Sequence, residues 1–237
     1  MRICFTWDDG ALEDQKLFEL HQKYELPGMF FVPTENSEGR KVLSPEAIRA
    51  NHSKLISFGG HTRHHVYLTR IPLRSVQQEV RDNRLYLENL LGEKVPHFCL
   101  PGGQYTKEIL QEVYNEYQTI RTADTMCFHS EMDFKRPSFH MYPRGKRSLL
   151  VNGLKMHSLA QTIHVAKNIR SSYWEILRNL LGYEATHDAS GEVIIWGHSW
   201  EIEELDLWSD VEDIFKIVSA SYKQQCVSYD VLCNKSV

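Results

Sequence analysis

The stretch Ile3-Cys4-Phe5-Thr6-Trp7-Asp8-Asp9-Gly10 opens the chain with a mainly apolar run that ends in two adjacent acids and a glycine. The run at residues 3–7 predicts a short buried strand. The two carboxylates therefore come at its carboxyl end, where α/β proteins build their sites. Adjacent carboxylates at a buried rim repel each other unless a cation lies between or beside them. The stretch indicates an α/β fold with a cation near its first strand.

Short apolar runs alternate with amphipathic segments along the rest of the chain. Strands are expected at residues 3–7, 29–32, 55–58, 97–100, 118–121, 193–196 and 227–229. Helices are expected at residues 12–24, after Ser44-Pro45, at 73–91, 106–117 and 173–181, and from a capping-box pattern at 209–212. This alternation predicts about seven parallel strands covered by helices. An open doubly wound sheet and a partial barrel both fit the pattern, and residues 122–158 are expected to form long loops with one irregular strand.

The composition is that of an ordinary globular protein. Of the 237 residues, 42% are hydrophobic and 24% charged, which suits a single domain over residues 1–237. The net charge is −4 and no basic block occurs, so a nucleic-acid partner is not expected. We expect no transmembrane segment and no signal peptide. The five cysteines are expected to be reduced, which together with the missing leader predicts a cytoplasmic protein.

A histidine pair follows the third expected strand, in the stretch His61-Thr62-Arg63-His64-His65. If a helical turn begins there, His61 and His65 share one face and can grip one ion. His64 offers a competing register and is expected to be exposed or to support the ligands. Asp9, His61 and His65 can supply three ligands and leave a fourth position open, as in catalytic zinc sites. Asp8 is then free to act as a base.

Two further motifs end expected strands. Pro101-Gly102-Gly103 forms a turn in which backbone N–H groups can approach a ligand closely. His198 follows the run at 193–196 and one glycine, which can aim its side chain into the same cleft. Each motif alone is common in proteins without such a site. Acid pair, histidine pair, glycine turn and late histidine at the carboxyl ends of four strands together indicate one active site.

These motifs resemble those of the polysaccharide deacetylase family, the NodB-homology domain of carbohydrate esterase family 4. The usual T-F-D-D-G is Thr6-Trp7-Asp8-Asp9-Gly10 here, and the usual H-[ST]-x-x-H is His61-Thr62-Arg63-His64-His65. The third motif, around R-P-P-Y-G, is similar to residues 99–103, and the late L-x-H motif is similar to residues 195–198. The resemblance covers about residues 2 to 230.

The resemblance implies a distorted (β/α) barrel with about seven parallel strands. It also implies metal-dependent removal of an N- or O-acetyl group from a sugar or polysaccharide precursor. Carried over by position, Asp9, His61 and His65 hold one divalent metal ion. Asp8 activates the water, and His198 protonates the leaving amine. The Pro101-Gly102 turn would offer an N–H to the oxyanion. Zn²⁺ suits this ligand set best, although Co²⁺, Ni²⁺, Mn²⁺ or Fe²⁺ could bind.

The chain departs from the family pattern at Cys99, which stands where the third motif usually has an arginine that contacts the base. We expect Arg121 or Arg144 to replace that arginine. An acid is also expected to orient the late histidine, and Asp124 and Asp133 are the candidates. Among the aromatic residues, Tyr105 and Trp200 are expected to line the cleft and contact sugar.

Three alternatives remain open at this stage. The same metal triad could serve a related amide hydrolase or deformylase on another substrate. The Cys99 departure could instead mark a catalytically weakened carbohydrate-binding relative. In a third alternative Cys99 is itself a nucleophile paired with His198, which requires an activating neighbour that lowers the thiol pKa.

Overall fold

The computed structural model of the chain describes residues 1–188 and 190–234. At its centre lies one sheet, with eight strands among the described residues in the order β6-β5-β4-β3-β2-β1-β8-β7 and every neighbouring pair parallel. The strands are Arg2–Trp7 (β1), Gly28–Val32 (β2), Ile56–Gly60 (β3), His97–Cys99 (β4), Thr119–Arg121 (β5), Phe134–Lys135 (β6), Phe139–His140 (β7) and Glu192–Gly197 (β8). The predicted α/β class with parallel strands is confirmed, with one strand more than expected.

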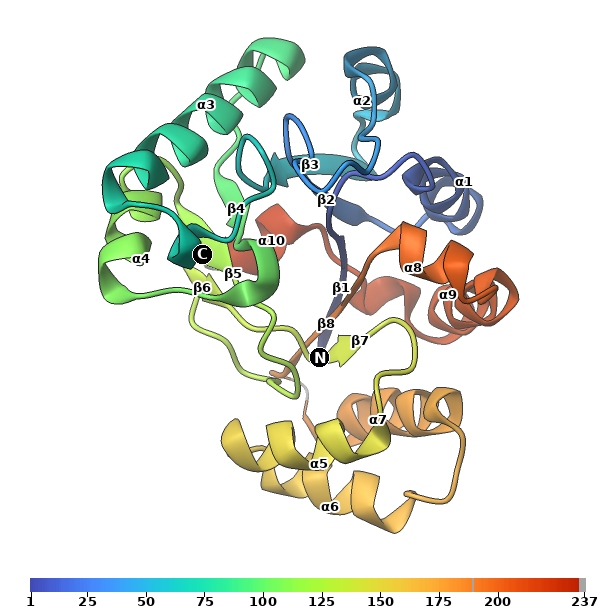
Figure 1. Cartoon of the computed structure of the whole chain (residues 1–237). Helices are drawn as coiled ribbons and strands as arrows, with labels where there is room; N and C mark the ends of the chain where they lie inside the picture. Colours follow the sequence, from blue (N-terminus) through green and yellow to red (C-terminus); the bar gives the residue numbers. More distant parts are fainter. Residues whose placement is uncertain (189, 235–237) are drawn as a thin grey trace.

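Helices surround this sheet (Figure 1). They are Asp14–Tyr24 (α1), Pro45–Asn51 (α2), Leu73–Leu91 (α3), Lys107–Tyr114 (α4), Lys146–Lys155 (α5), Leu159–Lys167 (α6), Tyr173–His187 (α7), Ser199–Glu204 (α8), Trp208–Tyr222 (α9) and Tyr229–Cys233 (α10). The neighbours α1 and α9 cover one part of the sheet, α3 and α4 another, and α5–α7 form a separate layer beside β7. None of the described helices has the length and apolarity that crossing a membrane requires.

The sheet curls into a distorted barrel, because its two edge strands are nearly consecutive in the chain. Only residues 136–138 separate β6 at one edge from β7 at the other. Three linking residues span little more than about 10–14 Å, so the two edges must lie close together. This arrangement decides between the two sheet forms that the alternating pattern allowed, in favour of the barrel.

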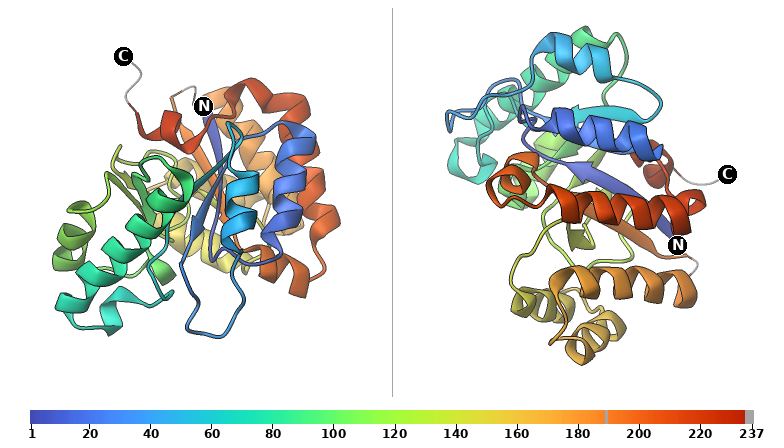
Figure 2. Two further views of the ribbon diagram at one scale, coloured as in Figure 1. Left: turned by 90° about the horizontal axis from the view of Figure 1, so that it is seen from above. Right: turned by 90° about the vertical axis from the view of Figure 1, so that its right-hand side faces the viewer.

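Side chains alternate between the two faces of the barrel wall. In β1, Ile3, Phe5 and Trp7 pack outward in the main core, whereas Cys4 faces inward. Inside the barrel, Cys4 belongs to an apolar cluster with residues from β2, β4, β8 and α10. α10 follows Val227, whose N–H donates to Ile3 O at 2.9 Å, so it closes the amino ends of the strands. Figure 2 shows the arrangement from two further sides. The carboxyl ends of the strands are not covered by α10 and can hold a functional site.

Several local predictions were wrong. Residues 227–229 are no strand: Ser228 caps α10, and a single bridge links Cys226 to Ile3. The capping box expected at 209–212 is absent, because α9 already begins at Trp208. Residues 122–158 hold two short strands and α5 rather than one irregular strand. All five cysteines are free thiols, as expected.

Candidate active site

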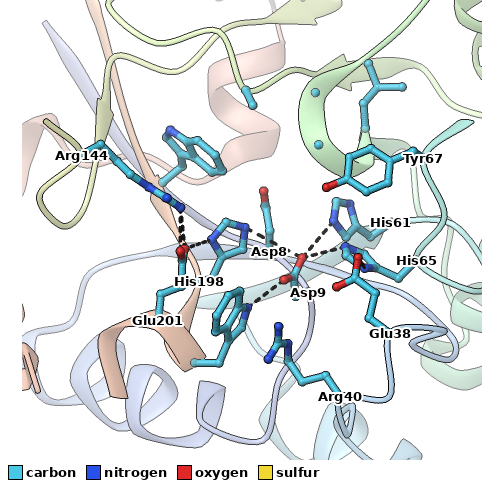
Figure 3. Close-up of a pocket in the computed structure, with 16 residues that line it drawn as sticks. Asp8, Asp9, Glu38, Arg40, His61, His65, Tyr67, Arg144, His198 and Glu201 are labelled. Carbon is cyan, nitrogen blue, oxygen red and sulfur yellow. Dashed lines mark hydrogen bonds and ion pairs between the residues drawn. The ribbon is translucent and has the colours of Figure 1, made fainter. Parts of the chain in front are cut away.

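The four motifs meet in one cleft of about 360 Å³ at the carboxyl ends of the strands (Figure 3). Asp8 and Asp9 follow β1, His61 follows β3, the residues from Leu100 follow β4, and His198 follows β8. The lining residues are Asp8, Asp9, Glu38, Arg40, His61, His65, Tyr67, Leu100, Gly102, Gly103, Ala123, Arg144, Trp196, His198, Trp200 and Glu201. Segments far apart in sequence therefore build one cavity that gathers several charged side chains.

Asp9, His61 and His65 form a compact cluster in the cleft. The Oδ1 atom of Asp9 lies 3.3 Å from His61 Nε2 and 3.0 Å from His65 Nε2. All three side chains are buried, with 6%, 2% and 8% of their surfaces exposed. Burial opposes ionisation of Asp9, but His198, His61 and His65 lower its pKa far enough to keep it charged. One carboxylate oxygen and two imidazole nitrogens thus converge within reach of a single ion.

The hydrogen bonds around this cluster suit a metal ligand set. His61 Nδ1 lies 2.8 Å from the carbonyl oxygen of Cys99, so it must carry the proton and leaves the Nε2 lone pair free. The second carboxylate oxygen of Asp9 accepts from Trp200 Nε1 at 2.8 Å, which leaves Oδ1 for an ion. Nitrogen and carboxylate donors of this kind fit Zn²⁺ and related divalent ions. The residues present therefore fit the expected metal.

No helical turn brings the histidines together, contrary to the prediction. Residues 61–65 form an irregular turn in which Thr62 and His65 have φ values of 67° and 53°, and Asp9 has a φ of 76°. Such left-handed conformations cost energy in residues with a side chain and are concentrated at functional sites. His64 points to Glu79, with its Nδ1 2.6 Å from Oε1, and takes no place in the cluster.

Asp8 is held by Arg121, one of the two arginines suggested for this role. The guanidinium Nη2 of Arg121 donates to Asp8 Oδ1, and its Nη1 donates to the carbonyl of Thr122 at 3.0 Å. Both partners are buried, Arg121 fully. Burial disfavours the charge of Arg121, but the Asp8 carboxylate raises its pKa and keeps it protonated. Arg144 does not reach Asp8, because it pairs with Glu201.

The thiol at the position of the usual arginine is a buried neighbour of the base. Cys99 Sγ lies 3.5 Å from Asp8 Oδ2 and donates its proton there. Burial raises the pKa of the Cys99 thiol well above its ordinary value. A reactive cysteine requires the opposite shift, so the geometry disfavours Cys99 as a nucleophile.

His198 is fixed by a residue that the sequence reasoning missed. Its Nδ1 lies 2.7 Å from Glu201 Oε2 and 2.8 Å from the hydroxyl of Tyr142, while its Nε2 lies 3.9 Å from Asp9 Oδ1. Neither of the two expected acids contacts His198. The backbone N–H of Asp124 donates to the Thr122 hydroxyl, and Asp133 does not line the cleft. The sequence did contain a signal for this contact, because Glu201 in α8 follows the N-cap residue His198 by about one helical turn.

Burial and the nearby Asp9 carboxylate raise the pKa of Glu201 to about 7. Arg144 Nη2 contacts both of its carboxylate oxygens, at 2.7 and 2.8 Å. Burial lowers the pKa of His198, and the carboxylates of Asp9 and Asp8 oppose that shift. Glu201 therefore links Arg144 to the late histidine and holds both in place.

The glycine turn and one of the two expected aromatic residues line the cleft. Gly102 has a φ of 63° and faces Tyr67, whose ring would overlap any side chain added there. Pro101 is buried and is not among the lining residues, so its backbone supports the turn. Trp200 lines the cleft, as expected. Tyr105 does not: its ring packs edge-on against Phe134, 5.4 Å between centroids, outside the cavity.

The parallel barrel thus carries a histidine–carboxylate cluster in the cleft at the carboxyl ends of its strands. Residues 1–118, which hold the first three motifs, match the family model described as polysaccharide deacetylase, and the chain belongs to this family. Arg121 and His198 lie beyond the matched residues. No curated protein matched the chain.

Solved structures show the same fold at low sequence identity. The family 4 carbohydrate esterase from Streptomyces lividans, in complex with acetate, is 12% identical, with 92% of this chain and 88% of that chain covered and a TM-score of 0.58. A peptidoglycan deacetylase variant from Bacillus subtilis is 14% identical, with 98% of this chain and 89% of that chain covered and a TM-score of 0.55. A polysaccharide deacetylase from Bacillus cereus is 20% identical, with 56% of this chain and 45% of that chain covered and a TM-score of 0.50. Three similar structures are matched over only about half of their length, between 45% and 56%.

Proposed function

We propose that this chain is a metal-dependent hydrolase that removes an acetyl group from an N-acetylated, or O-acetylated, sugar or polysaccharide precursor. The observation that supports this most strongly is the convergence of Asp9 Oδ1 with the Nε2 atoms of His61 and His65, beside a second buried carboxylate at Asp8. We also propose that residues 1–237 form one catalytic domain, since the cleft joins residues from both halves of the chain.

Asp9, His61 and His65 would hold one divalent ion, for which Zn²⁺ is our first choice. When bound, such an ion supplies a Lewis acid that polarises the acyl carbonyl and lowers the pKa of water. The proton transfers would be carried out by side chains of the protein. Asp8 is not needed as a ligand, and the Arg121 guanidinium donates to its carboxylate and fixes its position. It would take the proton of the attacking water.

His198 would give a proton to the departing sugar nitrogen. Its Nδ1 is held by Glu201 and Tyr142, so Nε2 is the atom that faces the cleft. Cleavage of an amide requires this step, because an amine leaves far more readily once it is protonated. Gly102 would offer its backbone N–H to the negative oxygen that forms on the acyl carbon. These roles account for every polar motif at the carboxyl ends of the strands.

The test is a product assay on the zinc-loaded chain. Chitin oligosaccharides, acetylated xylan and an N-formylated amino sugar serve as N-acetyl, O-acetyl and N-formyl substrates, and acetate and formate are both quantified. The proposal expects acetate from at least one of them, lost in the Asp8→Asn and His198→Ala variants. Formate from an N-formylated amino sugar without acetate from any substrate would instead support the related deformylase. Sugar binding without any product would support the catalytically weakened carbohydrate-binding relative.

A further inference from the structure

Arg40 occupies a defined position at the edge of the cleft. It belongs to the loop between β2 and α2, and its guanidinium carbon lies 3.6 Å from the centre of the Trp200 ring. The loop is tied to the histidine turn, because the N–H of Ser37 donates to the carbonyl of His64 at 3.0 Å. Figure 3 shows Arg40 beside Asp9 and Glu38, with its side chain directed into the cavity. The side chain is therefore placed by packing.

The charge of Arg40 has no carboxylate partner in the part of the chain that the structure describes. The other two arginines of the site are paired: Arg121 with Asp8 and Arg144 with Glu201. The acids that line the cleft pair with other residues, and no carboxylate oxygen of the described residues lies within 4.0 Å of the Arg40 nitrogens. The Nε of Arg40 is buried without a hydrogen-bond partner. Glu201 interacts with the Arg40 charge only beyond ion-pair distance, where Arg40 is one of the groups that oppose the rise of the Glu201 pKa. A cation that lines a cleft without a carboxylate in contact is a ready site for an anion.

Glu38 is the nearest candidate for a partner within the same loop. Its side chain is 46% exposed and its carboxylate lies 3.9 Å from His65 Nδ1. It does not form an ion pair with Arg40. Glu38 therefore does not neutralise Arg40, and the positive charge of Arg40 faces the cavity.

The way Arg40 packs also leaves its hydrogen-bonding groups usable. A guanidinium that stacks on an aromatic ring uses its face, while its N–H donors lie in the plane and point outward. Two parallel donors of this kind match a carboxylate or phosphate group in geometry and charge. Trp200 is in turn fixed by its bond to Asp9, so the stacked pair is held beside the proposed metal ligand.

We infer that Arg40 selects acylated sugars that carry an anionic group, a carboxylate or a phosphate, near the acyl group that is removed. The inference rests on the proposed deacetylation and names its substrate class. Both anions offer the same pair of oxygen acceptors, and the stacked guanidinium binds either. Neutral sugars have no group that satisfies this donor pair.

Three probes separate the sources of the anion: N-acetylglucosamine is neutral, N-acetylglucosamine 6-phosphate carries a phosphate, and N-acetylmuramic acid carries a carboxylate. With the zinc-loaded chain, kcat/KM for acetate release should be higher for at least one anionic sugar than for the neutral one. Which of the two is preferred identifies the source of the anion. Raising the salt concentration should reduce this preference, because screening weakens the attraction.

Variants test whether Arg40 is responsible. Arg40→Gln should reduce the anionic-to-neutral ratio of kcat/KM by about ten- to a hundredfold, the scale of a lost charge-assisted bond. Arg40→Lys, which keeps the charge but not the fork, should fall between that variant and the wild type. The matched control is Lys41→Gln, which removes a neighbouring exposed charge outside the cleft and should leave the ratio unchanged.

The outcomes are distinct. If the wild type hydrolyses the neutral and anionic sugars equally well, the inference is overturned while the proposed function stands. The same holds if Arg40→Gln lowers all three rates in proportion, because Arg40 then only supports Trp200. If none of the sugars, nor the oligosaccharides of the product assay, releases acetate, the proposed function itself fails and the inference with it.

Discussion

The buried pair of Arg121 and Asp8 offers the sharpest test of how this site works without the usual arginine. Arg121→Met removes the guanidinium and keeps an apolar chain of similar length. Both partners are buried, so the change leaves the Asp8 carboxylate without its counter-charge. Breaking a buried pair from one side costs about 3–5 kcal/mol in the free energy of unfolding. Correct positioning of a general base contributes about 10²–10⁴ in rate, so kcat should fall at least about a hundredfold.

The assay combines urea unfolding of the metal-free chain with acetate release by the zinc-loaded chain. The double variant Asp8→Asn/Arg121→Met should lose less stability than the two single variants together, because replacing both members of a buried pair is often nearly neutral. The matched control is Lys135→Met. Lys135 is fully buried and contacts both carboxylate oxygens of Glu192, at 3.1 and 2.9 Å, away from the cleft. Glu192 keeps its ion pair with Arg2 at 2.6 Å, so this variant should lose stability, though less than Arg121→Met, and keep its kcat.

Three results would refute this reasoning. If Arg121→Met were destabilised by less than about 1 kcal/mol, the contact would not be a buried ion pair of the expected strength. If its kcat fell no further than that of Lys135→Met, Arg121 would support the fold and not the base. Strict additivity of the single variants would point the same way.

Three further perturbations probe other parts of the account. Glu201→Gln should lower kcat by about tenfold or more, because His198 loses the carboxyl group that holds its Nδ1, while zinc content measured in parallel stays at the wild-type level; an unchanged kcat would remove Glu201 from the mechanism. Burial lowers the pKa of His21 to about 4, whereas the unfolded chain binds the proton near pH 6.5, so stability should be full above pH 6.5 and fall by about 3 kcal/mol as the pH drops to 4. Urea unfolding at several pH values checks this, and a His21→Asn variant with the same slope would contradict it. Gly92→Ala should cost about 1 kcal/mol for its left-handed backbone alone, whereas Gly102→Ala should cost clearly more, since a methyl there overlaps a tyrosine ring; equal unfolding free energies would show that the ring moves freely.

Much of the fold was predictable because strand signals and helix signals alternate cleanly. Six of the seven expected strands lie where the apolar runs stand. The exception, residues 227–229, is apolar because it closes the barrel interior: Tyr229 and Leu232 pack there from a short helix. β6 and β7 have two residues each, too few to show any period, and only their pairing with β5 and β8 defines them.

The site was predictable in its residues more than in its geometry. Asp9, His61 and His65 come together, but through left-handed turns rather than the helical spacing that suggested the pair. Arg121 contacts Asp8 because successive side chains of β5 point to opposite faces of the barrel wall. Ile120 packs on the outer face, whereas Arg121 points into the barrel. Such contacts depend on which strands are neighbours in the barrel. Glu201 was indicated only by its i,i+3 spacing from His198, and Arg40 lies in a loop whose path no periodic pattern indicates.

The central claim is that Asp9, His61 and His65 bind one divalent ion, and elemental mass spectrometry of the purified chain tests it most directly. The Asp9→Asn/His61→Ala double variant is measured beside the wild type, each after loading with zinc and removal of the excess. The account predicts about one ion per wild-type chain and almost none per variant chain. If both proteins held equally little metal after loading with zinc or cobalt, the metal-dependent mechanism would be contradicted.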